Sequence, residues 1–209
     1  MSTVLYIEAS PRGKRSRSTR VAEAFLETYR GAHPDDTVAR RNVFDLDLPD
    51  FDGPALDAKY AIMHGEKATE QQKNAWQRVE ALISDFTSAD KYVFSIPMWN
   101  FSIPYRLKQY IDVLVQPGYL FEVTAEGEYR GLVPDRPVFV AYARGGDYAD
   151  PVQAEADRQK PYIELILGFI GLTDLRSVIV QPTLMQGPDT AEQKTGQAIR
   201  EARNIAAEF

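Results

Sequence analysis

The segment that decides the fold runs from Asp90 to Val115 and reads DKYVFSIPMWNFSIPYRLKQYIDVLV. Its first part, Asp90–Ile96, is a short apolar run typical of a buried strand, and Pro97 ends it because proline has no amide donor for the ladder. From Pro104 to Val115 the apolar side chains recur at the i, i+3, i+4, i+7 spacing of a helix: Leu107, Tyr110, Ile111 and Leu114. Proline suits the first helical turn, where its missing amide is not needed. The segment is therefore a strand, a loop and a helix.

The same alternation continues on both sides of this segment. Apolar runs predict four further strands: Thr3–Ala9, Thr37–Phe44, Pro137–Ala143 and Leu175–Val180. Amphipathic spacing predicts four further helices: Ser18–Arg30, Thr69–Thr87, Tyr162–Ile170 and Thr190–Glu208. Tyr119–Tyr129 has a Glu-Gly turn and predicts a small hairpin, whereas Leu48–Gly65 is rich in Pro, Asp and Gly and predicts a loop with no more than one helical turn.

Strands alternating with helices predict parallel strands joined by crossover helices, which is an α/β fold. Five strands fit a flavodoxin-like three-layer sandwich with a parallel sheet of order 2-1-3-4-5 and helices on both faces, in a single domain over residues 1–209. Ligands of such sheets bind at the carboxyl ends of the strands, at the switch point. The loops after Ala9, Ile96 and Ala143 are therefore expected to form one site.

Composition excludes several kinds of chemistry. The 209 residues carry 24 Lys and Arg against 30 Asp and Glu, a net charge of −6, which argues against a nucleic-acid partner. There is no cysteine, so disulfides, thiol nucleophiles and iron–sulfur clusters are excluded; a cysteine-free chain fits a cytoplasmic location. Two histidines make an all-histidine metal site improbable, and no metal site is expected. No apolar run approaches the ~20 residues of a membrane helix, so no membrane partner is expected.

The first loop is the basic and hydroxyl-rich stretch SPRGKRSRST, residues 10–19. Because it leads into a helix, whose first amides lack partners, the expected guest is a phosphate. The alternative is a solvated basic loop in which Ser18 only caps the helix. The stretch matches neither the phosphate loop of nucleoside triphosphatases nor the dinucleotide-binding glycine pattern.

The other two loops suit a flat ring. Pro97–Pro104 places Trp99 and Asn100 at the mouth of a strand, where they can border a heteroaromatic system; local core packing remains the alternative for Phe101. After the strand that ends at Ala143, two adjacent glycines let backbone amides approach a ligand, or simply form a tight turn.

Nearly the whole chain resembles the FMN-dependent NADH-azoreductases, also described as NADH:quinone oxidoreductases. The resemblance rests on VLYI at 4–7, SRS at 16–18, PMWNF at 97–101, RGG at 144–146 and LGFIG at 167–171. It implies that FMN is the cofactor, with its phosphate held by Ser10, Ser16, Arg17 and Ser18. It also implies that Pro97, Met98, Trp99, Asn100 and Phe101 border the isoalloxazine, and that Ala143, Arg144, Gly145 and Gly146 approach its pyrimidine side.

The resemblance further implies a substrate pocket that includes Val123 and Phe169, and a homodimer whose partner contributes near Phe169. Phe121 and Tyr148 are expected to wall the substrate side of this pocket; the alternative for each is to cover core or dimer surface. The chain departs from the family pattern at Ala143, often a serine, and at Val123, often a tyrosine.

The implied activity is an FMN-dependent oxidoreductase that passes hydride from NADH or NADPH to small quinones and azo compounds by ping-pong kinetics. No side chain is expected to be catalytic, since the chemistry belongs to the flavin. Two alternatives remain open: a flavodoxin-type electron carrier and a non-enzymatic flavin- or nucleotide-binding protein.

Overall fold

Five parallel strands form the central sheet: β1 (Thr3–Glu8), β2 (Thr37–Asn42), β3 (Lys91–Pro97), β6 (Val138–Ala143) and β7 (Leu175–Val180). The computed structural model describes residues 1–63, 66–67 and 69–209. The spatial order is β2-β1-β3-β6-β7, so the predicted order 2-1-3-4-5, counted over the strands of this sheet, is confirmed.

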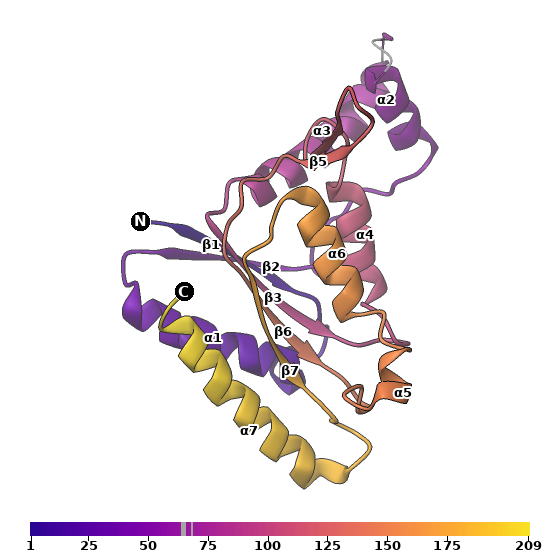
Figure 1. The fold of residues 1–209 in the computed structure, drawn as a ribbon. Helices are drawn as coiled ribbons and strands as arrows, with labels where there is room; N and C mark the ends of the chain where they lie inside the picture. Colours follow the sequence, from indigo (N-terminus) through magenta and orange to yellow (C-terminus); the bar gives the residue numbers. More distant parts are fainter. Residues whose placement is uncertain (64–65, 68) are drawn as a thin grey trace.

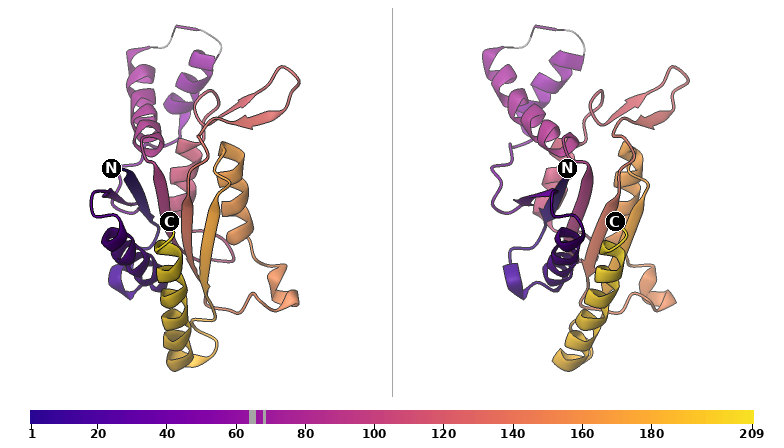
Figure 2. Two further views of the ribbon diagram at one scale, coloured as in Figure 1. Left: turned by 60° about the vertical axis from the view of Figure 1, so that its left-hand side comes forward. Right: turned by 90° about the vertical axis from the view of Figure 1, so that its left-hand side faces the viewer.

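Helices cover both faces of the sheet (Figures 1 and 2). One face packs on α1 (Arg17–Ala32) and α7 (Gly187–Ala206). The other packs on α3 (Glu70–Thr87), α4 (Tyr105–Leu114) and α6 (Lys160–Ile170).

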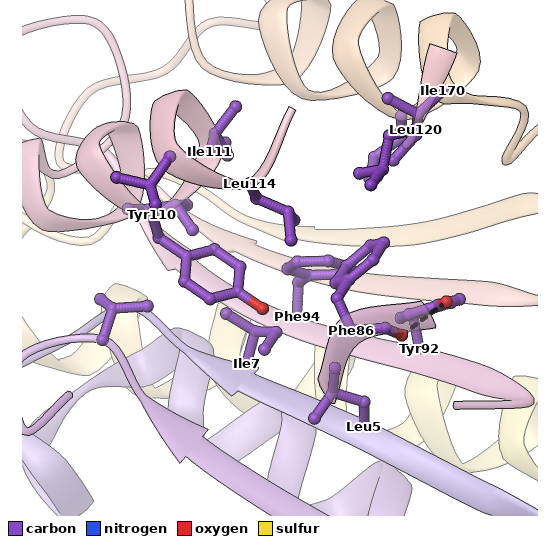
Figure 3. Close-up of a cluster of buried hydrophobic side chains, with 14 of the residues drawn as sticks. Leu5, Ile7, Phe86, Tyr92, Phe94, Tyr110, Ile111, Leu114, Leu120 and Ile170 are labelled. Carbon is purple, nitrogen blue, oxygen red and sulfur yellow. Dashed lines mark hydrogen bonds between the residues drawn. The ribbon is translucent and has the colours of Figure 1, made fainter. Parts of the chain in front are cut away.

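Two separate cores follow from the period of two in each strand, which sends alternate side chains to opposite faces. In β1, Val4 and Tyr6 enter the α1–α7 core, whereas Leu5 and Ile7 enter the core on the other face. Figure 3 shows part of this second core, with Leu5 and Ile7 on the sheet side and residues of α4 opposite them.

The loop predicted over Leu48–Gly65 is wrong, because the structure forms a helix of 11 residues there, α2 (Gly53–Met63). Asp52 caps it, since its Oδ1 accepts from the Ala55 amide at 3.5 Å. The side chains described as buried in this helix are small ones, Ala55, Ala58 and Ala61, and they do not make the strong apolar stripe by which an amphipathic helix is predicted. Residues 64 and 65, the end of the predicted loop, lie outside the described residues.

The predicted hairpin forms as β4 (Phe121–Val123) and β5 (Tyr129–Gly131), which pair antiparallel. It extends with α2 past the end of the sheet where the strands begin (Figures 1 and 2). Gly131 and Gly171 lie in close contact there, since a Cβ on either would stand 2.4 Å from backbone of the facing segment. Two short helices were not predicted: η1 (Gly13–Arg15) and α5 (Pro151–Ala154). No helix in the described part of the chain is long and apolar enough to cross a membrane.

Candidate functional site

The carboxyl ends of β1, β3 and β6 lie side by side, so the three loops that follow them meet at one edge of the sheet. The Ala9 amide donates to the Ser95 carbonyl at 3.0 Å, and the Met98 amide donates to the Ala143 carbonyl at 2.8 Å. These bonds tie the start of each loop to the neighbouring strand.

The first loop presents buried hydroxyls and free amides. Ser16 caps α1 by accepting from the Thr19 amide, so the cap is Ser16, and Ser18 belongs to the helix. The Ser16 and Ser18 hydroxyls lie 3.1 Å apart and are buried, as is Ser10. The amides of Ser10, Arg17 and Ser18 donate to no described residue. This donor set at a helix N-terminus suits an anion.

The Arg17 side chain points away from the loop, toward α7. Arg17 Nη1 donates to the Ala191 carbonyl at 3.0 Å and to Thr195 Oγ1 at 2.8 Å, both on α7. It also contacts Glu192, which lies 2.5 Å from Arg20. The hydrogen bond from Arg20 lowers the pKa of Glu192 to about 2, so this carboxyl is charged at neutral pH. Arg17 therefore offers a ligand its backbone amide rather than its guanidinium.

The second loop is a tight turn with unusual backbone angles. Trp99 and Ser102 exchange two amide-to-carbonyl bonds of 2.9 and 3.0 Å, and the two residues between them, Asn100 and Phe101, have φ of 46° and 70°. Two consecutive positive φ values define a type I′ turn, in which asparagine is favoured first and glycine second. Phe101 occupies the glycine position and exposes 56% of its surface. Trp99 lies near Phe44, with ring centroids 5.8 Å apart.

In the third loop, the Arg144 and Gly145 carbonyls bind the segment that follows β7. The Gly145 oxygen accepts the amides of Thr183, Leu184 and Met185 at 3.1 to 3.3 Å. A Cβ on Gly145 would stand 2.9 Å from Leu184 Cδ1, and one on Gly146 would stand 3.3 Å from the Tyr148 ring. The amides of Gly145 and Gly146 have no partner among the described residues, and neither do those of Asn100 and Phe101.

Arg144 turns into the protein. It is 3% exposed, and its Nε donates to Gln159 Oε1 at 2.9 Å. The family resemblance implied that Arg144 approaches the cofactor; in the structure its guanidinium faces Gln159 at the start of α6, and only its backbone follows the loop.

A fourth segment, residues 181–186 between β7 and α7, was missed. It includes a cis bond before Pro182, and it brings Leu184 and Met185, 78% and 64% exposed, against the glycine loop. The only available signal was its place after the fifth strand, at the same edge of the sheet.

The four residues expected in a substrate pocket are divided. Tyr148 lies at the carboxyl edge beside Gly146. Phe169 lies at the carboxyl end of α6, and Phe121 contacts it with ring centroids 4.7 Å apart. The Val133 amide, just after the hairpin, also donates to the Ile170 carbonyl at this end of the helix. Val123 belongs to the same hairpin. Because 11 helical residues span about 16 Å, one chain does not bring Phe121, Val123 and Phe169 to the loops.

These features define a flavodoxin-like protein, and the family described as having a flavodoxin-like fold matches residues 2–206. An FMN-dependent NADH:quinone oxidoreductase of Nitratidesulfovibrio vulgaris is 52% identical over the whole of both chains. One from Desulfotalea psychrophila is 44% identical over all of this chain and 98% of its own. The chain thus belongs to the FMN-dependent NADH:quinone oxidoreductase family.

Two solved azoreductase structures have the same fold as this chain. An azoreductase from Bacillus anthracis str. Sterne superposes with a TM-score of 0.91 at 33% identity, with each chain fully covered. An FMN-dependent NADH-azoreductase from Bacillus anthracis str. Ames Ancestor, solved in complex with FMN, superposes with a TM-score of 0.89 at 29% identity, covering 100% of this chain and 99% of that one.

Proposed function

We propose that this protein is an FMN-dependent oxidoreductase that passes hydride from NADH or NADPH to small quinones and azo compounds. The observation that carries the proposal is the set of unpaired amides and buried hydroxyls at the carboxyl edge, beside exposed aromatic rings. FMN matches this set, because its phosphate takes donors at a helix N-terminus and its ring takes aromatic walls and backbone amides.

Each loop has its own task in this proposal. The phosphate is held by the hydroxyls of Ser10, Ser16 and Ser18 and by the amide of Arg17. The ring is bordered by the turn after β3: Pro97, Met98, Trp99, Asn100 and Phe101. Its pyrimidine side faces backbone of the loop after β6: Ala143, Arg144, Gly145 and Gly146.

Bound FMN supplies the hydride chemistry, and the chain binds, orients and shields it. The free amides of Gly145 and Gly146 stabilise negative charge on the pyrimidine side, since fixed donors cost no reorganisation when charge develops. Trp99 and Phe101 exclude water from one side of the ring. No side-chain acid or base is required of the chain.

The working assembly in this proposal is a cytoplasmic homodimer of a single FMN-binding domain, residues 1–209. A second copy would supply what one chain separates, because the hairpin and α6 expose apolar side chains far from their own loops. Val123, Tyr129 and Leu165 are 57%, 68% and 70% exposed. In the dimer, the hairpin and α6 of one subunit would bring Phe121, Val123 and Phe169 to the Tyr148 of the other, around the substrate.

The test is an absorption titration followed by steady-state kinetics. Purified apoprotein should take up FMN, NADH alone should bleach it anaerobically, and double-reciprocal plots with a quinone should be parallel. Slow bleaching by NADH with ready one-electron exchange with proteins would indicate an electron carrier instead. Failure to bind FMN would leave a non-enzymatic role.

Two helix-cap variants locate the phosphate site. Ser16→Ala removes the cap of α1, and Thr69→Ala removes the cap of α3, where Thr69 and Gln72 form a capping box. Each should cost about 1 kcal/mol of stability. Only Ser16→Ala should also weaken FMN binding, by about 10- to 100-fold, because a charged acceptor loses a donor. Equal FMN affinities in both variants would contradict the site.

A further inference from the structure

A buried polar network lies beneath the candidate site, centred on the Arg144 guanidinium. Its Nε donates to Gln159 Oε1 at 2.9 Å, and its Nη1 donates to Gln181 Oε1 at 3.3 Å. Its Nη2 lies 2.8 Å from Asp157 Oδ2 and forms an ion pair with it, although the angle does not suit a hydrogen bond. The cation also lies near two rings, with the centroids of Tyr142 and Tyr148 at 5.8 and 5.6 Å. One carboxylate, two amide oxygens and two ring faces therefore surround the buried charge.

Gln159 is the member that links this cation to a second strand. It precedes α6, is 0% exposed, and donates from Nε2 to the Ile96 carbonyl at 3.0 Å. Ile96 lies next to Pro97, where the aromatic turn begins, and Arg144 lies next to Gly145. One amide group therefore connects the carboxyl end of β3 to the carboxyl end of β6.

Such a bridge limits how far the two strand ends can move apart. Backbone groups that are buried need a partner, and a buried cation needs its acceptors, so both halves of the bridge are costly to break. The backbone of Arg144 reinforces the arrangement, since its amide donates to the Val180 carbonyl and its carbonyl accepts from the Thr183 amide.

We propose that Gln159 is a positioning residue for FMN. By joining Ile96 to Arg144 it adds a side-chain bridge to the Met98–Ala143 backbone bond, and it thereby fixes how the aromatic turn and the glycine loop lie around the pocket that the ring enters. The inference rests on the proposed function, since it assigns to these two loops the task of holding the ring.

The chain offers a matched control in Gln116, a second buried glutamine. It is 1% exposed, and its Nε2 donates to the carbonyls of Asp112 and Val113 at the end of α4. The comparison is therefore Gln159→Leu against Gln116→Leu. Three quantities are measured on each: the FMN dissociation constant, the visible circular dichroism of bound FMN, and the melting temperature of the apoprotein.

The expected result is at least a tenfold weaker FMN affinity and an altered visible dichroism in Gln159→Leu. Gln116→Leu should keep both within twofold of the wild type even where its melting temperature falls as much. The proposal is overturned by an affinity and a dichroism in Gln159→Leu that match the wild type, or by equal changes in both variants.

A milder variant covers the case in which Gln159→Leu does not fold. Gln159→Glu keeps an acceptor for Arg144 but sets a carboxylate oxygen in place of the donor to the Ile96 carbonyl. This substitution breaks the bridge to β3, so FMN should bind at least threefold more weakly with altered dichroism. Unchanged values would overturn the proposal. A wild-type apoprotein that binds no FMN would instead overturn the proposed function, so the two failures are distinguishable.

Discussion

Replacing Arg40 by methionine tests a buried ion pair beside the phosphate loop. Glu8, the last residue of β1, is 2% exposed and accepts from Thr19 Oγ1 at 3.1 Å. Arg40 on β2 contacts the same carboxylate through Nη2 at 2.6 Å and Nε at 3.1 Å. The guanidinium also reaches Glu23 of α1, so it ties three elements together.

The expected magnitude follows from how the two side chains are buried. Removing one partner of a fully buried pair costs about 3–5 kcal/mol, because the remaining charge keeps its desolvation penalty. Here the Glu8 side chain is 3% exposed but that of Arg40 is 48% exposed, so water screens part of the interaction. Arg40→Met should therefore lower the free energy of unfolding by about 2–3 kcal/mol, or the melting temperature by about 4–12 °C at this chain length.

The assay is urea unfolding of the apoprotein at neutral pH, with two comparison variants. Arg41→Met removes the neighbouring arginine from its pair with Asp85, where both side chains are about one-third exposed, and should cost no more than about 1 kcal/mol. Glu8→Gln combined with Arg40→Met removes the stranded charge and should recover at least about 1 kcal/mol. Equal losses in the Arg40 and Arg41 variants, or a double variant no more stable than Arg40→Met, would refute the reasoning.

Three further predictions concern a close contact, an acid-sensitive pair and a strained turn. Gly171→Ala should lower the free energy of unfolding by about 3 kcal/mol or more, because φ is 111° and the Cβ would stand 2.4 Å from the Val133 carbonyl oxygen. Thermal unfolding checks this, with Gly168→Ala as the control: a Cβ there meets nothing, so its stability should be unchanged or higher. Because the pKa of Glu192 is lowered from 4.5 to about 2 in the folded protein, its contribution is complete above about pH 4.5 and is lost as the pH falls toward about 2. Melting temperatures from about pH 6 to about pH 3 should therefore fall more steeply in the wild type than in Glu192→Gln, and equal slopes would count against the pair. Phe101→Gly relieves φ of 70° and should raise apoprotein stability by about 1 kcal/mol while weakening FMN binding in a fluorescence titration; unchanged FMN affinity would remove Phe101 from the site.

The elements that form as predicted are those whose determining interactions are local. The alternation in Thr3–Ala9 and the helical spacing in Thr69–Thr87 each lie within one element, and both elements form within a residue or two of the predicted bounds. The prediction failed at α2, where the side chains described as buried are those of small alanines.

At the site, the chain's pattern of strands and helices is enough to predict which strand ends carry unusual loops, because parallel topology places all carboxyl ends at one edge. Where the side chains of those loops point depends on packing between distant elements. Arg17 bonds to α7, 174 positions along the chain, and Arg144 turns toward Gln159 beneath the loop. Phe121 and Phe169 meet each other at the end of the sheet opposite the loops. Spacing along a chain predicts which residues share a face of one helix or strand. The direction in which a loop side chain points depends instead on which faces of different elements meet after folding.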